Sequence, residues 1–250
     1  MSLAYIVLGV FILFAYTAEA MTGFGSIVIA ISLGALLFPI EWLQAVLVPL
    51  NICMTGFLTW RHRRHIDGRL LLRLIMPFML VGTLAGFWLQ RYLGGDGLKL
   101  AFAVLILWFS GRELWRLRGN TAIRVKPMWW SRGVITLAGI THGLFASGGP
   151  LLVYGLAATA LDKARFRATL IVVWFSLNSL LTVLLLMQGR IQQSWWALAA
   201  YLPLIPLGIW LGERFHHQVD EARFRVWIYR ILALAGCGLM LASVRRLWMG

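Results

Sequence analysis

The chain contains two apolar stretches that are each too long for one membrane-spanning helix and that are interrupted by glycine near the middle. The first runs from residue 1 to 40 with Glu19 as its one charged residue, and the second runs without charge from 133 to 161. About 20 helical residues cross the hydrocarbon core of a bilayer. Because both stretches exceed this length and glycine or proline weakens the helix at the interruption, we expect a membrane protein with two broken segments.

The sequence downstream of the two breaks also repeats. Five positions recur at an offset of 126 or 127 residues: Pro77, Gly82, Gly86, Asn51 and Thr55 are matched by Pro203, Gly208, Gly212, Asn178 and Thr182. The paired glycines have the spacing of close helix-packing seams, and we expect them to be packing residues and not site residues. The agreement of several residue types in register indicates an internal repeat.

Composition excludes most other classes of protein. Hydrophobic residues make up 60% of the chain and charged residues 13%, which is typical of an integral membrane protein. The formal net charge of +14 would suggest a nucleic-acid partner on a soluble surface, but the basic residues lie in short links between apolar runs. There they set topology and meet lipid head groups. No nucleic acid, metal or cofactor is expected.

The positive-inside rule discriminates between two ways of counting segments. If each broken stretch crosses once, there are eight spans, and the Lys and Arg residues divide 14 to 9 between the two faces. If each broken stretch counts as two segments, 18 of the 23 share one face, in the links 61–73, 112–132, 163–167 and 214–230. The second count obeys the rule far better and makes the halves opposite in orientation.

The sequence therefore predicts an all-α, polytopic membrane protein built from two inverted-topology repeats. Each repeat has a broken or re-entrant first hairpin followed by three transmembrane helices, about 8 to 10 segments in all. The repeats are expected at 1–115 and 133–250, joined by a basic cytoplasmic linker at 116–132, with both termini outside the cytoplasm. Whether the broken stretches span or re-enter is left open.

At Gly23-Phe24-Gly25 and at Ser147-Gly148-Gly149-Pro150 the chain resembles the sulfite exporter TauE/SafE family, and the similarity extends along nearly its whole length. The resemblance implies a multi-pass protein of the cell membrane, in bacteria the inner membrane. It also implies transport of sulfur-containing anions such as sulfite, thiosulfate, sulfoacetate or other organosulfonates. The family is usually drawn with about eight spans, whereas the charge count favours ten segments.

The two breaks suggest how an anion could be bound. A helix that starts after a break presents unpaired backbone N–H groups and the positive end of its dipole, so two such ends at the midplane make an anion site. Glycine lets an oxyanion approach the backbone, hydroxyl groups can donate hydrogen bonds, and proline suits a first helical turn. The expected substrate-binding residues are Thr22, Gly23, Phe24, Gly25, Ser26, Asn51, Ser147, Gly148, Gly149, Pro150 and Asn178.

Each of these residues also has a purely structural alternative. The glycines could serve only close helix packing, and Asn51 and Asn178 could serve only to hydrogen-bond neighbouring helices together. Glu19 and His142 are ionisable groups inside the long stretches, which makes them candidates for proton coupling. Their alternative is a neutral, hydrogen-bonded Glu19 and a packed His142, paired with each other.

Two other functions are compatible with the same residues. An intramembrane serine hydrolase would use Ser147 as nucleophile and His142 as base, although five residues across a helix break is not a standard arrangement. A passive anion channel could use the same breaks. We expect a transporter and not an enzyme. The direction of transport, the coupling ion and the formation of a homodimer are not determined by the sequence.

Overall fold

The computed structural model describes residues 3–23, 25–93, 95–118, 127–156, 162–216 and 221–249, and all regular secondary structure in these ranges is helical. The first half contains α1 (Leu3–Thr22), α2 (Ser26–Gly34), α3 (Ile40–His62), a 3-10 turn η1 (Arg63–His65), α4 (Gly68–Leu70), a π-helical turn η2 (Leu71–Ile75), α5 (Met76–Gln90) and α6 (Gly95–Arg118). The second half contains α7 (Met128–Phe145), α8 (Gly149–Gly155), α9 (Lys163–Met187), α10 (Trp195–Tyr201), α11 (Leu204–His216) and α12 (Glu221–Met249). The all-α fold class is confirmed.

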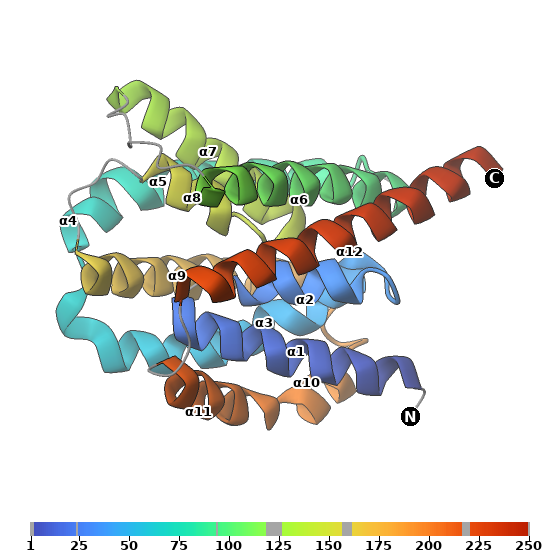
Figure 1. Cartoon of the computed structure of the whole chain (residues 1–250), viewed down its shortest axis with the longest axis horizontal. Helices are drawn as coiled ribbons and strands as arrows, with labels where there is room; N and C mark the ends of the chain where they lie inside the picture. Colours follow the sequence, from blue (N-terminus) through green and yellow to red (C-terminus); the bar gives the residue numbers. More distant parts are fainter. Residues whose placement is uncertain are drawn as a thin grey trace.

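The second half has the same order of helices as the first half, but its helices run in the opposite direction through the bundle. In each half a first helix is followed by a short helix, a long helix, a helix interrupted near its start and a final long helix. In Figure 1, α1 and α6 run from the right of the view to the left, whereas α7 and α12 run from left to right. The described helices therefore form two inverted sets of five segments, as the charge count predicts.

Each broken stretch folds into a helical hairpin with one long and one short arm. With a rise of about 1.5 Å per residue, the nine residues of α2 and the seven of α8 cover less than half of a core roughly 30 Å thick. α2 packs back against α1, and α8 packs back against α7. Among the described residues, six helical segments are long and apolar enough to cross a membrane alone: Leu3–Thr22, Ile40–His65, Gly68–Gln90, Ala164–Met187, Trp195–Phe215 and Val226–Arg246.

The two halves interlock in one bundle. α5 packs along α7 and α1 packs along α11, so the first helix of each half lies against the fourth segment of the other half. α3 pairs with α9, and α6 pairs with α12. Described helix occupies both ends of the 116–132 segment expected as a linker, because α6 continues to Arg118 and α7 begins at Met128. Residues 119–126 of that segment lie outside the described residues.

Glycines lie where the interlocked helices approach each other most closely. A Cβ atom on Gly86 would collide with the backbone carbonyl of Ile140 on α7, and one on Gly208 would lie 2.8 Å from the Cβ of Tyr16 on α1. Carbon atoms in ordinary contact stay about 3.5–4.0 Å apart. The other two glycines of the repeated pattern are similarly crowded. The prediction that these glycines are packing residues is confirmed.

Replacing Gly86 with leucine is expected to destabilise the whole bundle. Overpacking a tight interface typically costs about 1–3 kcal/mol, and here the obstacle is backbone, which cannot rotate aside. The matched control is Gly111→Leu on α6, because a Cβ at Gly111 meets no atom within 4 Å. Thermal unfolding of the detergent-solubilised chain measures the difference. Equal unfolding temperatures for the two variants would contradict a seam at Gly86.

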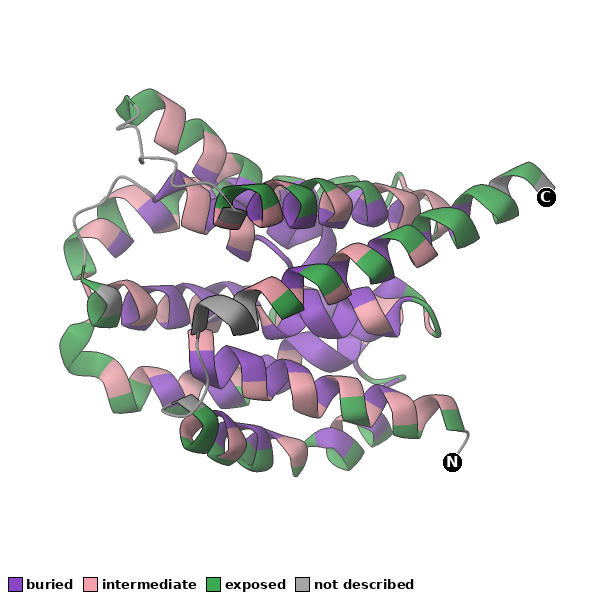
Figure 2. Ribbon diagram, in the orientation of Figure 1, coloured by how far each residue is buried: buried purple, intermediate pink, exposed green. Residues whose placement is uncertain are grey.

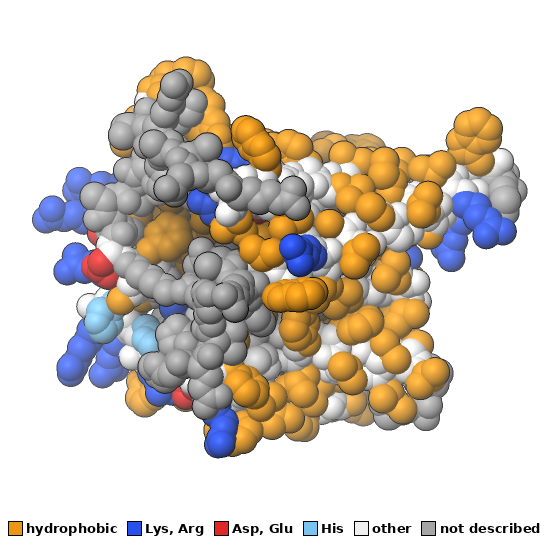
Figure 3. Space-filling view, viewed as in Figure 1, with side chains coloured by type: hydrophobic (Ala, Val, Ile, Leu, Met, Phe, Trp, Pro, Cys, Tyr) orange, Lys and Arg blue, Asp and Glu red, His pale blue; other side chains and the backbone are white. Residues whose placement is uncertain are grey.

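The surface separates basic ends from an apolar body. Buried residues concentrate in the middle of the bundle, around α2, α3 and α9 (Figure 2). Lys and Arg gather at the left end of the view, and hydrophobic side chains cover much of the rest (Figure 3). Large exposed apolar side chains such as Trp88 and Trp108 suit contact with lipid. Both termini lie at the right, opposite the basic links (Figure 1). The non-cytoplasmic location of the termini stays a prediction.

Candidate functional site

The two helix breaks meet inside the bundle. α2 begins at Ser26 directly after Gly25, whose φ of 104° is in the left-handed region that favours glycine. α7 ends at Phe145 and is followed by Ala146, which also adopts the left-handed conformation, with φ 52°, and donates its N–H to the carbonyl of His142 at 2.6 Å. This is a common way to end a helix, although alanine is less suited to it than glycine. Both short helices therefore start next to a sharp reversal of the chain.

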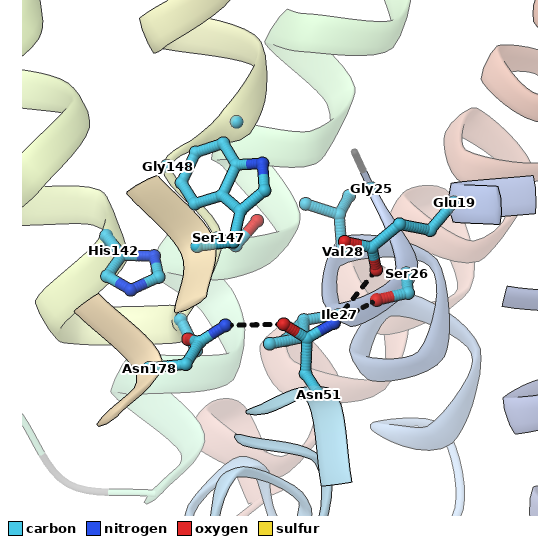
Figure 4. Close-up of a pocket in the computed structure, with 13 residues that line it drawn as sticks. Glu19, Gly25, Ser26, Ile27, Val28, Asn51, His142, Ser147, Gly148 and Asn178 are labelled. Atoms are coloured by element: carbon cyan, nitrogen blue, oxygen red, sulfur yellow. Dashed lines mark hydrogen bonds between the residues drawn. The ribbon is translucent and has the colours of Figure 1, made fainter. Parts of the chain in front are cut away.

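A small cavity joins the two breaks (Figure 4). Its lining comes from both halves: Glu19, Gly25, Ser26, Ile27, Val28, Asn51, His142, Ala146, Ser147, Gly148, Gly149, Trp174 and Asn178. Its volume is about 20 Å³. One water molecule needs roughly 10–15 Å³ of such space, so a molecule of four or more heavy atoms enters only when the lining moves apart.

The polar side chains on the first-half side of this cavity satisfy one another. Asn51 donates from Nδ2 to Glu19 Oε2 and to Ser26 Oγ, both at 2.9 Å. Asn178 donates from Nδ2 to Asn51 Oδ1 at 2.6 Å, which links α9 to α3 (Figure 4). Glu19, Asn51 and Asn178 are each 1% exposed. The two asparagines line the cavity and bond α3 to α9, whereas their role as donors to an anion stays a prediction.

The second-half side of the cavity is different. Neither ring nitrogen of His142 has a hydrogen-bond partner among the described residues, and the same holds for Trp174 Nε1 and Asn178 Oδ1. The rings of His142 and Trp174 lie against each other with centroids 5.6 Å apart. Leaving a buried polar group unsatisfied costs about 1–3 kcal/mol. Several such groups on one cavity wall give it free hydrogen-bonding capacity for a polar molecule.

Glu19 and His142 occupy matching positions in the two hairpins. Each lies three residues before the last residue of its helix, which is Thr22 in α1 and Phe145 in α7. The alternative that they pair with each other is wrong, since Glu19 accepts from Asn51 and both nitrogens of His142 are without a partner. The cavity lies between the two side chains (Figure 4).

Of the expected site residues, three do not line this cavity and a fourth lies outside the described residues. Thr22 and Pro150 line a neighbouring cavity that shares Gly25 with the first. Pro150 does occupy the first turn of α8, as expected. Gly23, with φ 84°, packs under the side chain of Arg167. Phe24 lies outside the described residues.

The geometry does not support the serine hydrolase hypothesis. A catalytic base must lie within hydrogen-bond reach of its serine. Ser147 and His142 line the same cavity, but the nitrogens of His142 have no hydrogen-bond partner in the described structure. The described residues also contain no cluster of three or more His, Cys, Asp or Glu side chains that could hold a metal ion.

Trp174 and Arg167, both on α9, were missed by the sequence reasoning. Trp174 precedes Asn178 by four residues and Arg167 precedes it by eleven, so all three lie near one face of α9. This spacing was the signal that could have found them. It was overlooked because tryptophan is common at membrane interfaces and Arg167 lies in a basic link.

Side chains from the opposite half hold the ends of both first helices. Arg167 donates to the carbonyl of Ala20 near the end of α1. Gln44 and Gln90 each donate from Nε2 to the carbonyl of Leu144 near the end of α7, at 2.9 Å. The last carbonyls of a helix need such partners, and a positive charge is favoured there. A shift of either hairpin against the other half would break these bonds.

Comparison with known proteins identifies the relatives of this chain. A family model described as sulfite exporter TauE/SafE matches residues 8–239. The chain is 28% identical over 178 residues to the probable inner membrane transporter protein TsaS of Comamonas testosteroni, covering 70% of this chain and 71% of that protein. It is 24% identical over 241 residues to the probable sulfite/organosulfonate exporter TauE of Cupriavidus necator, covering 90% of each. No solved structure matches.

Proposed function

This chain belongs to the sulfite exporter TauE/SafE family of membrane transporters, and from that premise we propose that it is a secondary carrier of small sulfur-containing anions. The substrate class is sulfite, thiosulfate, sulfoacetate or another organosulfonate, since one relative is named a sulfite/organosulfonate exporter. The membrane is the bacterial inner membrane, by analogy with the relative named for it.

The anion binds in the cavity between the two breaks. The observation that carries this proposal is the wall of unpartnered polar groups formed by His142 and Trp174, facing the start of α2. The first intrahelical bond of α2 is donated by Ile29 to Gly25, so the N–H groups before Ile29 have no partner within the helix. The N–H groups of Ile27 and Val28, together with the indole and imidazole, offer an oxyanion several donors, and Arg167 adds a positive charge near the end of α1.

The contributions of the two half-helices are unequal. α2 has nine residues, whereas α8 has seven and carries Pro150, which has no N–H, in its first turn. The donors on the second-half side are therefore chiefly the side chains of His142 and Trp174. The sequence predicts two equivalent helix ends, whereas in the structure side chains supply most of the donors in the second half.

Glu19 makes proton coupling physically reasonable. A carboxylate in this cavity would repel a bound anion, and a proton on Glu19 removes that repulsion, so the proton and the anion are expected to bind together. Transport then requires that the hairpins shift to open the cavity to each face in turn. Such a shift would break the bonds from Arg167 to Ala20 on one side or from Gln44 and Gln90 to Leu144 on the other.

Replacing Trp174 with phenylalanine is expected to weaken anion binding by about tenfold or more. The change keeps an aromatic ring but removes the indole N–H, and a hydrogen bond to a charged group is worth about 1.5–3 kcal/mol. The control is Trp108→Phe on α6, where the tryptophan is 50% exposed. Titration calorimetry with sulfite, thiosulfate, sulfoacetate, taurine and sulfate on the purified chain measures the affinities.

The outcomes of this titration separate the possibilities. Unchanged affinity in Trp174→Phe would remove the indole from the site. A wild-type chain that binds none of these anions would contradict the proposed function. Counterflow of labelled anion in proteoliposomes then distinguishes a carrier from a passive channel, since only in a carrier does efflux of an unlabelled pool drive transient accumulation of the label.

A further inference from the structure

A second cavity adjoins the anion cavity on the side of α12. Its walls are largely apolar, with Ile29 from α2, Pro150 from α8 and Ile228 and Leu232 from α12. None of its described lining residues is charged. The hydroxyl of Thr22 at its edge donates to the carbonyl of Ala18. Such a surface is suited to a group without charge.

Gly25 and Val28 line both cavities, so the two spaces share a wall. A Cβ atom on Gly25 would meet nothing within 4 Å, which means that the position next to this backbone is open. The left-handed backbone at Gly25, with φ 104°, also disfavours any larger residue there. The polar cavity and the apolar cavity are thus adjacent at a residue that has no side chain.

We propose that the apolar cavity holds the organic substituent of a sulfonate whose charged head occupies the polar cavity. This inference rests on the proposed function and narrows its substrate. A sulfonate consists of a head of three oxygens and a carbon substituent on the sulfur, so it needs a polar and an apolar compartment side by side. Sulfite has no substituent and uses the polar cavity alone.

The size and lining of the apolar cavity select a short, uncharged substituent. Its volume is about 30 Å³ in this structure, and each group the size of water needs roughly 10–15 Å³ of such space, so about two carbon groups fit without further movement of its walls. Burying one methylene group raises the binding affinity about fourfold. A second charged group, such as the ammonium of taurine or the carboxylate of sulfoacetate, would lose its hydration and find no opposite charge, only the hydroxyl groups of Thr22 and Tyr229.

The test measures the affinity of the purified full chain for sulfite and for a series of sulfonates. For the wild-type chain, the affinity is expected to rise about fourfold from methanesulfonate to ethanesulfonate. Taurine and sulfoacetate are expected to bind at least about tenfold more weakly than ethanesulfonate. Leu232→Phe, which fills the cavity, is expected to lower the affinity for ethanesulfonate at least about tenfold and to leave the affinity for sulfite unchanged. Leu234→Phe, on the same helix at a side chain that is 74% exposed, is the matched control and should change neither.

Each outcome bears on one of the two proposals. If sulfite binds the wild-type chain, two results overturn the apolar subsite and leave the proposed function standing. In one, Leu232→Phe lowers the affinities for sulfite and ethanesulfonate equally; in the other, it lowers neither. If no sulfur oxyanion binds the wild-type chain, the proposed function itself fails. Should Leu232→Phe not fold, Leu232→Ala enlarges the cavity and is expected to move the preferred substituent to a longer chain. An unchanged preference would overturn the inference.

Discussion

Replacing Glu19 with glutamine is expected to abolish proton-driven accumulation of the anion while the anion still crosses the membrane down its own gradient. Glutamine has nearly the same shape, and its side-chain oxygen can still accept the hydrogen bond that Asn51 donates to Glu19 at 2.9 Å. The glutamine side chain cannot take up or release a proton at physiological pH. The cavity is therefore kept, and the group that would link the anion to the proton is removed.

The measurement is uptake of labelled sulfite or thiosulfate into proteoliposomes across an imposed gradient of about one pH unit. With one proton carried per anion and the membrane potential held at zero, the wild-type chain is expected to approach about tenfold accumulation, since one pH unit is a factor of ten in proton concentration. Glu19→Gln is expected only to equalise the two concentrations. The control is Glu113→Gln, because Glu113 is a largely buried carboxylate that is paired with Arg112 and Arg116 on α6, away from the cavity. Accumulation by Glu19→Gln at the wild-type level would exclude this residue from coupling.

Replacing Asn51 with leucine is expected to eliminate transport and to destabilise the bundle more than the same change at Asn178. The Asn51 side chain takes part in three hydrogen bonds, to Glu19, Ser26 and Asn178, whereas the Asn178 side chain takes part in one. Each buried partner left unsatisfied costs about 1–3 kcal/mol. Leucine fills a similar volume, so the comparison isolates the lost polar contacts.

Thermal unfolding of both variants in the same detergent, followed by transport assays, checks this difference. The repeat alone would predict equal effects, because Asn51 and Asn178 stand at matching positions in the two halves. The side-chain contacts predict unequal effects. Equal losses of stability would therefore mean that the hydrogen-bond network around Asn51 does not hold the cavity together as described.

The sequence predicted the architecture well because its strongest signals are global. Long uncharged runs need a bilayer, and the distribution of arginines across the links counts segments without reference to any side-chain contact. The question of whether the broken stretches span or re-enter could not be answered in this way. The answer depends on the seven- and nine-residue lengths of α8 and α2, and residue type alone does not set where such short helices end.

The candidate site was predicted less completely, for reasons that differ between residues. Glycine marks a break, but the left-handed residue at the second break is Ala146, which no composition rule selects. Thr22 and Pro150 are close to their breaks in sequence, yet the turn of the chain directs them to the apolar cavity. Trp174 and Arg167 reach the hairpins from α9, and such contacts between distant segments depend on how α9 crosses the bundle.

The central claim, that the anion sits between the two helix breaks, can be tested most directly with selenite. Selenite has the shape and charge of sulfite and a selenium atom that scatters X-rays anomalously. In crystals of the full chain soaked with selenite, an anomalous peak is expected in the cavity bounded by Gly25, His142 and Trp174. A peak that lies elsewhere in the bundle, or an empty cavity at selenite concentrations that saturate binding in solution, would contradict the claim.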